Sequence, residues 1–552
     1  MRISKRFIVA IIGLISLERL IGERLESAEP SAVADGNASS IGITLSSPSI
    51  NTAVFTSIGF LPNDNFSEVR SVTEDGTLAV GLSGQGAGPN GTGTYPIRWT
   101  SSGGVELLPN PPADGTSEPL SSFVTASDIT PDGSWIAYRA RPGGTGVREA
   151  MICSGSGAQS LALGRAGPGL RSAANQISDD GSIVFGWGFG TDGNQHAFRW
   201  SSATGYQSLS EPSGYAASAP AGRGVSADGT ISVGDIISYD GNSHEIAHQA
   251  YRWTAATDMQ TIGVLPGGNY SAALAVSKDG SRVFGVSQSA RVPGNNQLGF
   301  FQFDGELFLW TPAEGMTAVG GPPGYDTYGN LSGLSGDGAF AVVAAIDSTG
   351  NNNDDAFVYQ IATRTFVRLG DLLAAGGAID PGDSGWIRIA PSGISDNGNT
   401  IFGTGRNPNQ SDEGWIARFP DGFLAASQAA TYPDWQQQHF SAGQDGTSMS
   451  DPDLDGIPNA VEFASATNPW DASSGFRPSI KKAGSNSEFV YRRLHLPGNI
   501  TYTVQQSTDL IHWSPVSPMN TILAEDSEFR LVQASAPTNA SSRIFLRVHL
   551  TQ

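Results

Sequence analysis

The sequence contains a single cysteine, Cys153, among its 552 residues. One thiol can neither close a disulfide within the chain nor build a cysteine-based zinc site, so stability has to come from packing or from cations held by oxygen ligands. Charged residues are also scarce, at 15%, and their balance is acidic, with a formal net charge of -21. We therefore expect no nucleic-acid partner, because such a partner requires a basic surface.

Long apolar runs are also lacking. The run from Phe7 to Leu17 is too short to span a bilayer, which takes about 20 residues. Arg2, Lys5 and Arg6 precede it, and this order is typical of an export signal. We predict an export signal over residues 1–28, a Ser/Ala/Pro-rich linker over 29–52, and a secreted, extracellular or cell-envelope protein with no transmembrane span in the mature chain. The alternative is a short amphipathic N-terminal helix in a cytosolic protein.

Glycine is abundant, at 70 residues, and one glycine-containing phrase recurs along the chain. Its Asp-Gly or Asn-Gly pair stands between alternating apolar residues, which predicts a β-hairpin, since these pairs tolerate the positive φ of tight turns. The copies lie about 54 residues apart on average, near the period of propeller blades. They are SVTEDGTLAVG from Ser71, DITPDGSWIAY from Asp128, QISDDGSIVFG from Gln176, GVSADGTISVG from Gly224, AVSKDGSRVFG from Ala275, GLSGDGAFAVV from Gly333 and GISDNGNTIFG from Gly393.

A second phrase follows each hairpin and predicts a strand with one buried, mostly aromatic face. Its paired positions are Ile97 and Trp99, Met151 and Cys153, Phe198 and Trp200, Tyr251 and Trp253, Phe308 and Trp310, Phe357 and Tyr359, and Trp415 and Ala417. In most copies a further short strand leads into the next hairpin, so each unit offers about four strands.

The ends of the repeat region predict closure of a ring. FTSIGFLPNDN from Phe55 matches the end strand of a unit, although no complete unit precedes it, and the last unit breaks off soon after GWIARFPDG. An N-terminal strand that completes the last blade would remove the exposed sheet edge of an open array. We predict an all-β fold with a seven-bladed β-propeller over residues 53–425, closed by its N-terminal strand.

The two phrases together resemble the HAF repeat of bacterial extracellular proteins, named for the residues seen here at His196, Ala197 and Phe198. The copy DITPDGSWIAYRA also resembles the propeller repeat of TolB-type proteins. The resemblance implies export and a β-propeller-like domain, and it implies no catalytic residues.

His244, Glu245 and His248 form H-E-x-x-H, the motif of zinc peptidases. The motif requires a helix, because on a strand the two histidines would lie about 13 Å apart. In the repeat register, His248 falls near the start of an aromatic strand and His244 in the loop before it. We interpret the match as coincidental, with a zinc site as the alternative.

Past Pro420 the repeat stops, and DPDLDGIPNAVE follows within residues 426–474. This spacing is that of a twelve-residue, EF-hand-like calcium loop, in which Gly456 allows the sharp turn and oxygen ligands surround one ion. Pro458 cannot form the β-bridge of paired regulatory hands, so the loop resembles those of dockerin or thrombospondin type 3 repeats. The alternative is an acidic linker without metal. The predicted Ca2+ ligands are Asp451, Asp453, Asp455, the Ile457 carbonyl, Asn459 and Glu462.

Residues 475–552 change character again and predict a small antiparallel β-domain. Its strands are expected at FVYRRLHL from Phe489, ITYTVQQS from Ile500, EFRLVQAS from Glu528 and RIFLRVHL from Arg543. The module resembles one appended to large secreted bacterial proteins. Trp513 is either a sugar-stacking platform or a core aromatic residue.

Two functions follow from these patterns. The first is a non-enzymatic exported scaffold that binds an extracellular glycan or an envelope protein through loops at one end of the ring, because the recurring residues have structural explanations. The alternative is a secreted propeller hydrolase or lyase acting on polysaccharide, which needs carboxylates gathered at one mouth. Glu118 and Asp380 stand in loops that break the repeat and are candidates for that role.

Overall fold

The computed structural model describes most of the chain after its N-terminal segment. The described residues are 52–85, 93–108, 125–140, 147–158, 160–212, 221–239, 245–291, 305–322, 327–346, 355–427, 432–441, 443–483, 486–494, 500–516, 518–525, 529–537 and 545–551. The predicted export signal, residues 1–28, lies outside them.

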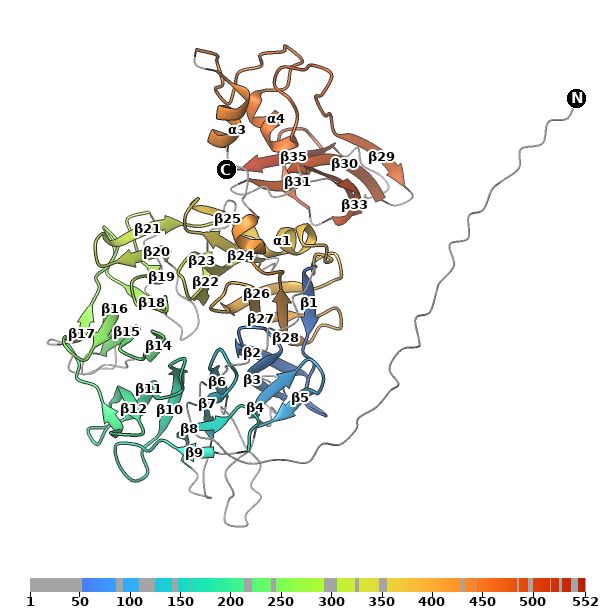
Figure 1. Cartoon of the computed structure of the whole chain (residues 1–552). Coiled ribbons are helices and arrows are strands. Elements are labelled where there is room, and N and C mark those ends of the chain that lie inside the picture. The colour runs from blue at the N-terminus through green and yellow to red at the C-terminus, as the bar shows by residue number, and fades with distance from the viewer. Residues whose placement is uncertain are drawn as a thin grey trace, which may run out of the picture. The chain divides into compact units, whose positions relative to one another are not determined.

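In the repeat region, strands that follow one another in the sequence pair antiparallel and form a series of sheets (Figure 1). In each sheet the recurring turn joins the first strand to the second, and the aromatic phrase is the third strand. The four-stranded sheets are β6–β9 (Ala126–Ile129, Trp135–Ala140, Glu149–Ser154, Ser160–Ala162), β10–β13 (Ser172–Ile177, Ile183–Phe189, Gln195–Ser201, Gly205–Ser208), β14–β17 (Ala221–Val225, Ile231–Tyr239, Glu245–Thr254, Asp258–Thr261), β18–β21 (Ser271–Val276, Val283–Ser287, Glu306–Thr311, Gly315–Gly320) and β22–β25 (Thr327–Leu334, Phe340–Ile346, Asp355–Gln360, Thr365–Arg368). The first repeat supplies β2–β5 (Phe66–Val72, Leu78–Gln85, Gly93–Thr100, Gly104–Leu107), which join the strands of the last repeat in one eight-stranded sheet through a single parallel pair, Phe66 with Asp412. The last repeat supplies β26 (Ile387–Ile394), β27 (Thr400–Arg406) and β28 (Asp412–Arg418).

The sheets are arranged in a ring. The first strand of each sheet contacts the first strand of the next, from β2 to β6, β10, β14, β18, β22 and β26, and β26 in turn contacts β2. Because these contacts return to their starting point, the first strands surround a central channel (Figure 1). Repeated four-stranded sheets around a channel are the architecture of a β-propeller, as predicted.

The N-terminal strand pairs where the sequence predicts it. Strand β1 (Val54–Ser57) runs antiparallel to β28, from Val54 opposite Arg418 to Ser57 opposite Trp415. The Phe55 ring stacks on Trp415 with centroids 5.6 Å apart and meets Trp386 edge-on at 5.3 Å. The N-terminal segment thereby becomes the fourth strand of the last sheet and covers its edge.

The third strands bury the side chains that the second phrase predicts. Tyr251, Phe308 and Trp415 are fully buried, and Trp310 is half-buried at the margin of its sheet. These side chains lie in hydrophobic clusters that join neighbouring sheets, such as the one in which Tyr251 and Trp253 meet Phe185 of the preceding sheet. The prediction of an aromatic face buried between blades is confirmed.

The recurring turns are stabilised by a shared hydrogen-bond pattern. The Ser or Thr hydroxyl two residues before each Asp or Asn donates to its side chain at 2.6 to 2.8 Å, from Thr73 to Asp75 through Ser395 to Asn397. The following glycine has a φ between 63° and 77° in every copy. That left-handed conformation explains why glycine recurs there.

Backbone hydrogen bonds link the turns of successive sheets around one mouth of the channel. Ala227 N–H donates to Lys278 C=O at 2.9 Å, and the residues at the same place in the other turns continue the series. Pro131 has no N–H and interrupts it. At the junction of the last and first sheets, Asn397 Nδ2 donates to Glu74 C=O at 3.2 Å. An amide can donate this hydrogen bond and a carboxylate cannot. This explains why the last turn carries Asn397 at the position where the other six turns carry Asp.

The remaining chain forms helices and two smaller sheets. Helices α1 (Leu369–Ala375) and α2 (Phe423–Ala426) belong to the last units of the repeat region, and α3 (Tyr432–His439) and α4 (Asn459–Ser465) follow. The sheet orders are β29-β30-β34-β33 and β32-β31-β35, and their strands pair antiparallel, as expected for residues 475–552. Its strands are β29 (Ser479–Ala483), β30 (Asn486–Leu494), β31 (Thr501–Ser507), β32 (Ser514–Pro515), β33 (Met519–Glu525), β34 (Phe529–Pro537) and β35 (Phe545–Thr551).

The segment predicted as a linker shares a core with this domain. Trp435 of α3 and Phe463 of α4 lie in one hydrophobic cluster with Leu494 of β30. Tyr502 Oη donates to Ala464 C=O at 2.5 Å. Across the described ranges, no helix is long and apolar enough to cross a membrane.

A buried ion cluster connects α1 to the C-terminal sheet. Asp371 is 2% exposed and accepts hydrogen bonds from Arg493 and from Arg530, the latter at 3.2 Å. Burial alone would raise the pKa of Asp371, but the guanidinium groups of Arg493, Arg368 and Arg530 lower it. The Asp371 carboxylate is therefore held ionised.

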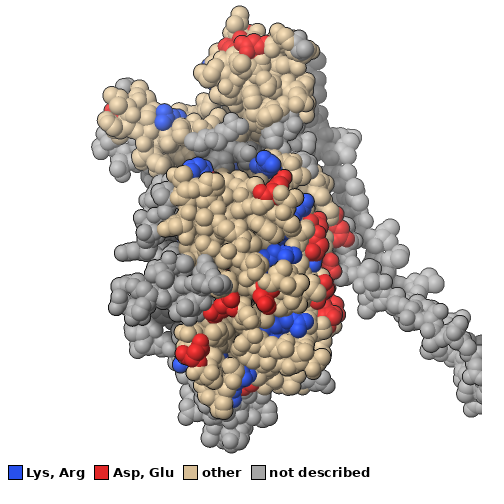
Figure 2. All heavy atoms as spheres, turned by 90° about the vertical axis from the view of Figure 1, so that its left-hand side faces the viewer, with Lys and Arg blue, Asp and Glu red and all other residues tan. Residues whose placement is uncertain are grey.

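The charged groups on the surface do not segregate strongly. On the face in Figure 2, Lys and Arg side chains lie singly or in small groups, and Asp and Glu gather toward one side. The described part of that face carries no broad basic patch.

Candidate functional site

A cavity of about 140 Å³ occupies the central channel. The first strands of the sheets form its walls. In six of these strands, the residue three positions before the turn Ser or Thr has no partner in the neighbouring strand. Such β-bulges redirect side chains, and Arg70, Arg223, Leu274 and Ser392 line the cavity from these positions. The skipped residues are Arg70, Ser127, Asn175, Arg223, Leu274 and Ser392.

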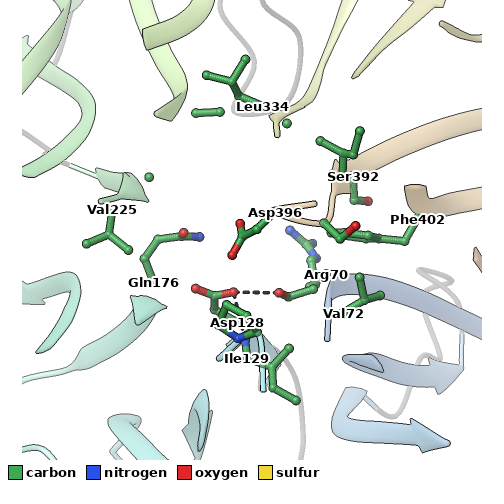
Figure 3. Close-up of a pocket in the computed structure, with 18 of the residues that line it drawn as sticks. Arg70, Val72, Asp128, Ile129, Gln176, Val225, Leu334, Ser392, Asp396 and Phe402 are labelled. Atoms are coloured by element: carbon green, nitrogen blue, oxygen red, sulfur yellow. Dashed lines mark hydrogen bonds between the residues drawn. The ribbon is translucent and has the colours of Figure 1, made fainter. Parts of the chain in front are cut away.

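Asp128 lies in the cavity wall next to a bulge (Figure 3). Its carboxylate accepts hydrogen bonds from Ser71 Oγ at 2.7 Å and from Ile177 N–H at 3.0 Å. Burial nevertheless raises the pKa of Asp128 to about 6, because these bonds and the nearby Lys278 offset the loss of solvation only in part. Asp128 therefore titrates close to neutral pH.

A second group of carboxylates surrounds Lys278 at the level of the turns. Lys278 Nζ lies 2.5 Å from Asp179 Oδ1 and 3.2 Å from Asp396 Oδ2. Burial raises the pKa of Asp396, Lys278 lowers it, and Asp179 raises it further, with a net upward shift. Glu74 also has a raised pKa, because of burial and the charges of Asp396 and Asp179. This end of the channel therefore carries more negative than positive charge.

Two guanidinium groups also line the cavity. Arg70 pairs with Glu68 at 2.9 Å. Arg223 Nε donates to Asp235, which is 1% exposed and also contacts His248 Nε2 at 2.8 Å. Burial would raise the pKa of Asp235, but Arg223 and His248 lower it to about 2. The Arg223 side chain is thus anchored by a buried, ionised carboxylate.

The H-E-x-x-H segment is not helical. Glu245 and His248 both belong to strand β16, and His244 lies outside the described residues. The spacing of a strand does not place residues i and i+4 on one metal. His248 instead contacts Asp235, and its ring meets Tyr270 edge-on at 4.1 Å. The interpretation of the motif as coincidental agrees with this geometry.

Three of the predicted calcium ligands lie close together in one loop. One side-chain oxygen from each of Asp451, Asp453 and Asp455 lies within 4.8 Å of the others. Gly456 has a φ of 86° and donates its N–H to Asp451 Oδ2 at 2.9 Å, so the loop turns sharply at the expected place. Asn459 and Glu462 follow on α4, three residues apart and therefore on one face of the helix.

The loop contains buried oxygen atoms that match a hard cation. Among the described residues, Asp451 Oδ1, Asp453 Oδ2, Asn459 Oδ1 and Glu462 Oε2 are buried and accept no hydrogen bond. Burying such atoms without a partner is costly, and Ca2+ is bound by carboxylate and amide oxygens of this kind. Burial and the charges of Asp453 and Asp455 raise the pKa of Glu462 to about 7. The residues present therefore fit calcium.

The other candidates from the sequence lie elsewhere. Glu118 is outside the described residues, and Asp380 accepts hydrogen bonds from Arg368 and from Gly382 N–H, at 2.9 Å for the latter. Asp380 is thus held in an ion pair. Trp513 is half-buried, and Arg547 lies over its ring at 4.2 Å from the centroid. That face of the Trp513 ring is covered by protein.

No known protein family matches this sequence, and no curated protein matches it at a significant level. Three solved structures with similar folds are TolB from Acinetobacter baumannii, an oligogalacturonate lyase in complex with manganese, and the β-propeller domain of the Trilobed protease from Pyrococcus furiosus. TolB is 15% identical over 53% of this chain, with a TM-score of 0.35, and this chain spans 63% of TolB. The lyase is 14% identical over 68% of this chain and 96% of its own, with a TM-score of 0.43. The protease domain is 11% identical over 64% of this chain and 95% of its own, with a TM-score of 0.39.

The fold is that of a β-propeller. Its assignment rests on the strand pairing and on the cyclic contacts of the first strands. At these identities and TM-scores, the similar structures carry no functional argument.

Sequence reasoning missed the residues of the channel. Arg70 directly precedes the first copy of the recurring phrase, and Asp128 and Lys278 stand inside it. Asp128 occupies a position at which the other copies carry uncharged residues, and Lys278 is the only basic residue at its position. A comparison of the copies position by position would have marked them as the departures from the repeat.

Proposed function

We propose that this chain is an exported, non-enzymatic β-propeller scaffold of seven blades, closed by β1, that binds an extracellular glycan or an envelope protein. One observation carries the proposal. The polar side chains that recur in every unit are engaged in the turns themselves, as in the Thr73–Asp75 and Ser395–Asn397 pairs. The recurring residues thus have a structural role, and the loops that vary between units are the parts available to bind a partner.

A calcium ion in the loop of residues 451–462 is part of this proposal. Asp451, Asp453, Asp455, the Ile457 carbonyl, Asn459 and Glu462 would hold it, supported by the buried oxygens that accept no hydrogen bond. The ion would neutralise the carboxylates and tie the loop to α4, whose Phe463 packs in the core of the C-terminal domain. Its role would be structural.

The test separates binding from turnover. Purified full-length protein is titrated with defined soluble polysaccharides, and the chain length of each polysaccharide is measured before and after incubation. Saturable binding with unchanged chain length supports the scaffold. Shortening of the polysaccharide refutes it. Absence of binding to every glycan in the set refutes a glycan as the partner. The same titration with isolated envelope proteins then tests whether the partner is a protein.

A secreted polysaccharide hydrolase or lyase is the second candidate, and one observation favours it. Carboxylates gather in the channel, where the pKa of Asp128 is raised to about 6 and that of Asp396 is raised as well. A carboxyl group with such a pKa can act as a general acid near neutral pH. If polysaccharide is shortened, the Asp128→Asn substitution should abolish the cleavage, and the variant should keep the fold of the wild-type protein.

A further inference from the structure

Four polar side chains from separate units point toward the middle of the channel cavity. They are Arg70 of β2, Asp128 of β6, Gln176 of β10 and Asp396 of the turn after β26 (Figure 3). Units far apart in the sequence thus contribute a guanidinium, an amide and two carboxylates to one small space. Packing alone does not require this, because an apolar or water-filled channel would serve the frame equally well.

The carboxylates are suited to an ammonium group. Asp179 and Asp396 already hold the ammonium of Lys278, so the chain itself shows this recognition at the turn level of the channel. Asp128, also in the cavity wall, faces the same space and makes only neutral hydrogen bonds, to the Ser71 hydroxyl and to backbone N–H groups. A second ammonium beside Asp128 and Asp396 would balance charge that Lys278 leaves uncompensated.

The Arg70 guanidinium is suited to a carboxylate. A guanidinium offers about five N–H donors, and the pair with Glu68 uses Nε and Nη2 of Arg70. Ser392 Oγ, which also lines the cavity, is buried and makes no hydrogen bond to the described residues. A buried hydroxyl of this kind is costly until it finds an acceptor, and a carboxylate supplies one.

We propose that the channel cavity is a binding site for a small zwitterion of the α-amino acid class. Its carboxylate lies at Arg70 and Ser392, and its ammonium lies at Asp128 and Asp396. The cavity of about 140 Å³ restricts the ligand to a short side chain or to the end of a short peptide. The site is separate from the variable loops and from the calcium loop, so it adds a function to the scaffold.

The experiment is isothermal titration calorimetry of the full-length protein with glycine, L-alanine and diglycine, beside methylamine and acetate as single-charge probes. The zwitterions should bind one per chain and about tenfold or more tightly than either single-charge probe, because only they use both ends of the site. If diglycine binds more tightly than glycine, the natural ligand is the end of a short peptide and not a free amino acid.

Variants locate the binding. Asp128→Asn, Arg70→Gln and Ser392→Ala are each expected to weaken L-alanine binding, the first two by about tenfold or more. Glu314→Gln, on an exposed turn, should leave it unchanged. Circular dichroism identifies any variant that fails to fold, and Ser392→Ala is the mildest of the three. Either of two results overturns the proposal: no heat from any zwitterion at millimolar concentration, or an affinity that the folded variants leave unaltered.

Discussion

Replacing Phe55 with alanine is expected to weaken the closure of the propeller. Strand β1 is only four residues long, and Phe55 contributes its main apolar contact, stacking on Trp415 and meeting Trp386 edge-on. Truncating a fully buried Phe costs about 3–5 kcal/mol, and each aromatic pair is worth about 0.5–1.5 kcal/mol beyond its buried area. Because Phe55 is half-buried, we expect a loss of about 2–3 kcal/mol in the free energy of unfolding.

Urea unfolding followed by tryptophan fluorescence measures this loss, since two tryptophans contact the deleted ring. Val54→Ala is the matched control: Val54 is the neighbouring residue of β1, pairs with Arg418 and is 40% exposed. Successive side chains of a strand face opposite sides, so this control should change stability by less than about 0.5 kcal/mol. Equal losses in the two variants would refute the assignment of Phe55 to the core side of β1.

Deletion of residues 53–60 extends the same reasoning. Without β1, β28 loses one antiparallel partner over residues 415–418, and the last repeat keeps only its own strands β26, β27 and β28. We expect a sharply lower melting temperature and a tendency to self-associate through the open edge. An unchanged melting curve would show that the ring does not depend on this pairing.

Three further changes test other parts of the molecule. Calcium at about 100 times its dissociation constant should stabilise the protein by about 2.7 kcal/mol. Thermal unfolding with and without chelator should show this gain in Glu488→Gln and no gain in Glu462→Gln. A gain retained in Glu462→Gln would contradict the site. Asp371→Asn removes the carboxylate that Arg530 and Arg493 share, so urea unfolding should show a loss of about 3–5 kcal/mol, and a loss below about 1 kcal/mol would refute a stabilising role for this cluster. The folded-state pKa of Asp128 is about 6 and its ordinary value is 3.8, so the folded protein binds the proton more tightly than the unfolded chain. The stability of the wild-type protein relative to Asp128→Asn should therefore fall as pH rises between about 4 and 6, by at most about 3 kcal/mol. Parallel stability profiles for the two proteins across that range would contradict the shift.

The channel shows where prediction from a single sequence stops. The side chains of Arg70 and Arg223 reach the cavity because a β-bulge at the same place in each strand turns them toward it. An alternating pattern assumes regular pairing and therefore gives no sign of the extra residue. The contact between Asp235 and His248 has a different origin: it depends on the register of β15 against β16, which short stretches of sequence do not record.

The sequence by itself determined the repeat, the turn chemistry, the buried third strands and the pairing of β1 with β28, because each depends on local residue types at a fixed period. It also placed the predicted calcium ligands together, since all of them lie within twelve consecutive residues. Only the tertiary structure decided that Asp128, Lys278 and Asp396 share one channel, and that Asp371 meets two arginines more than 100 residues further along the chain. Such contacts depend on how complete sheets close around an axis, and no short stretch of sequence records that closure.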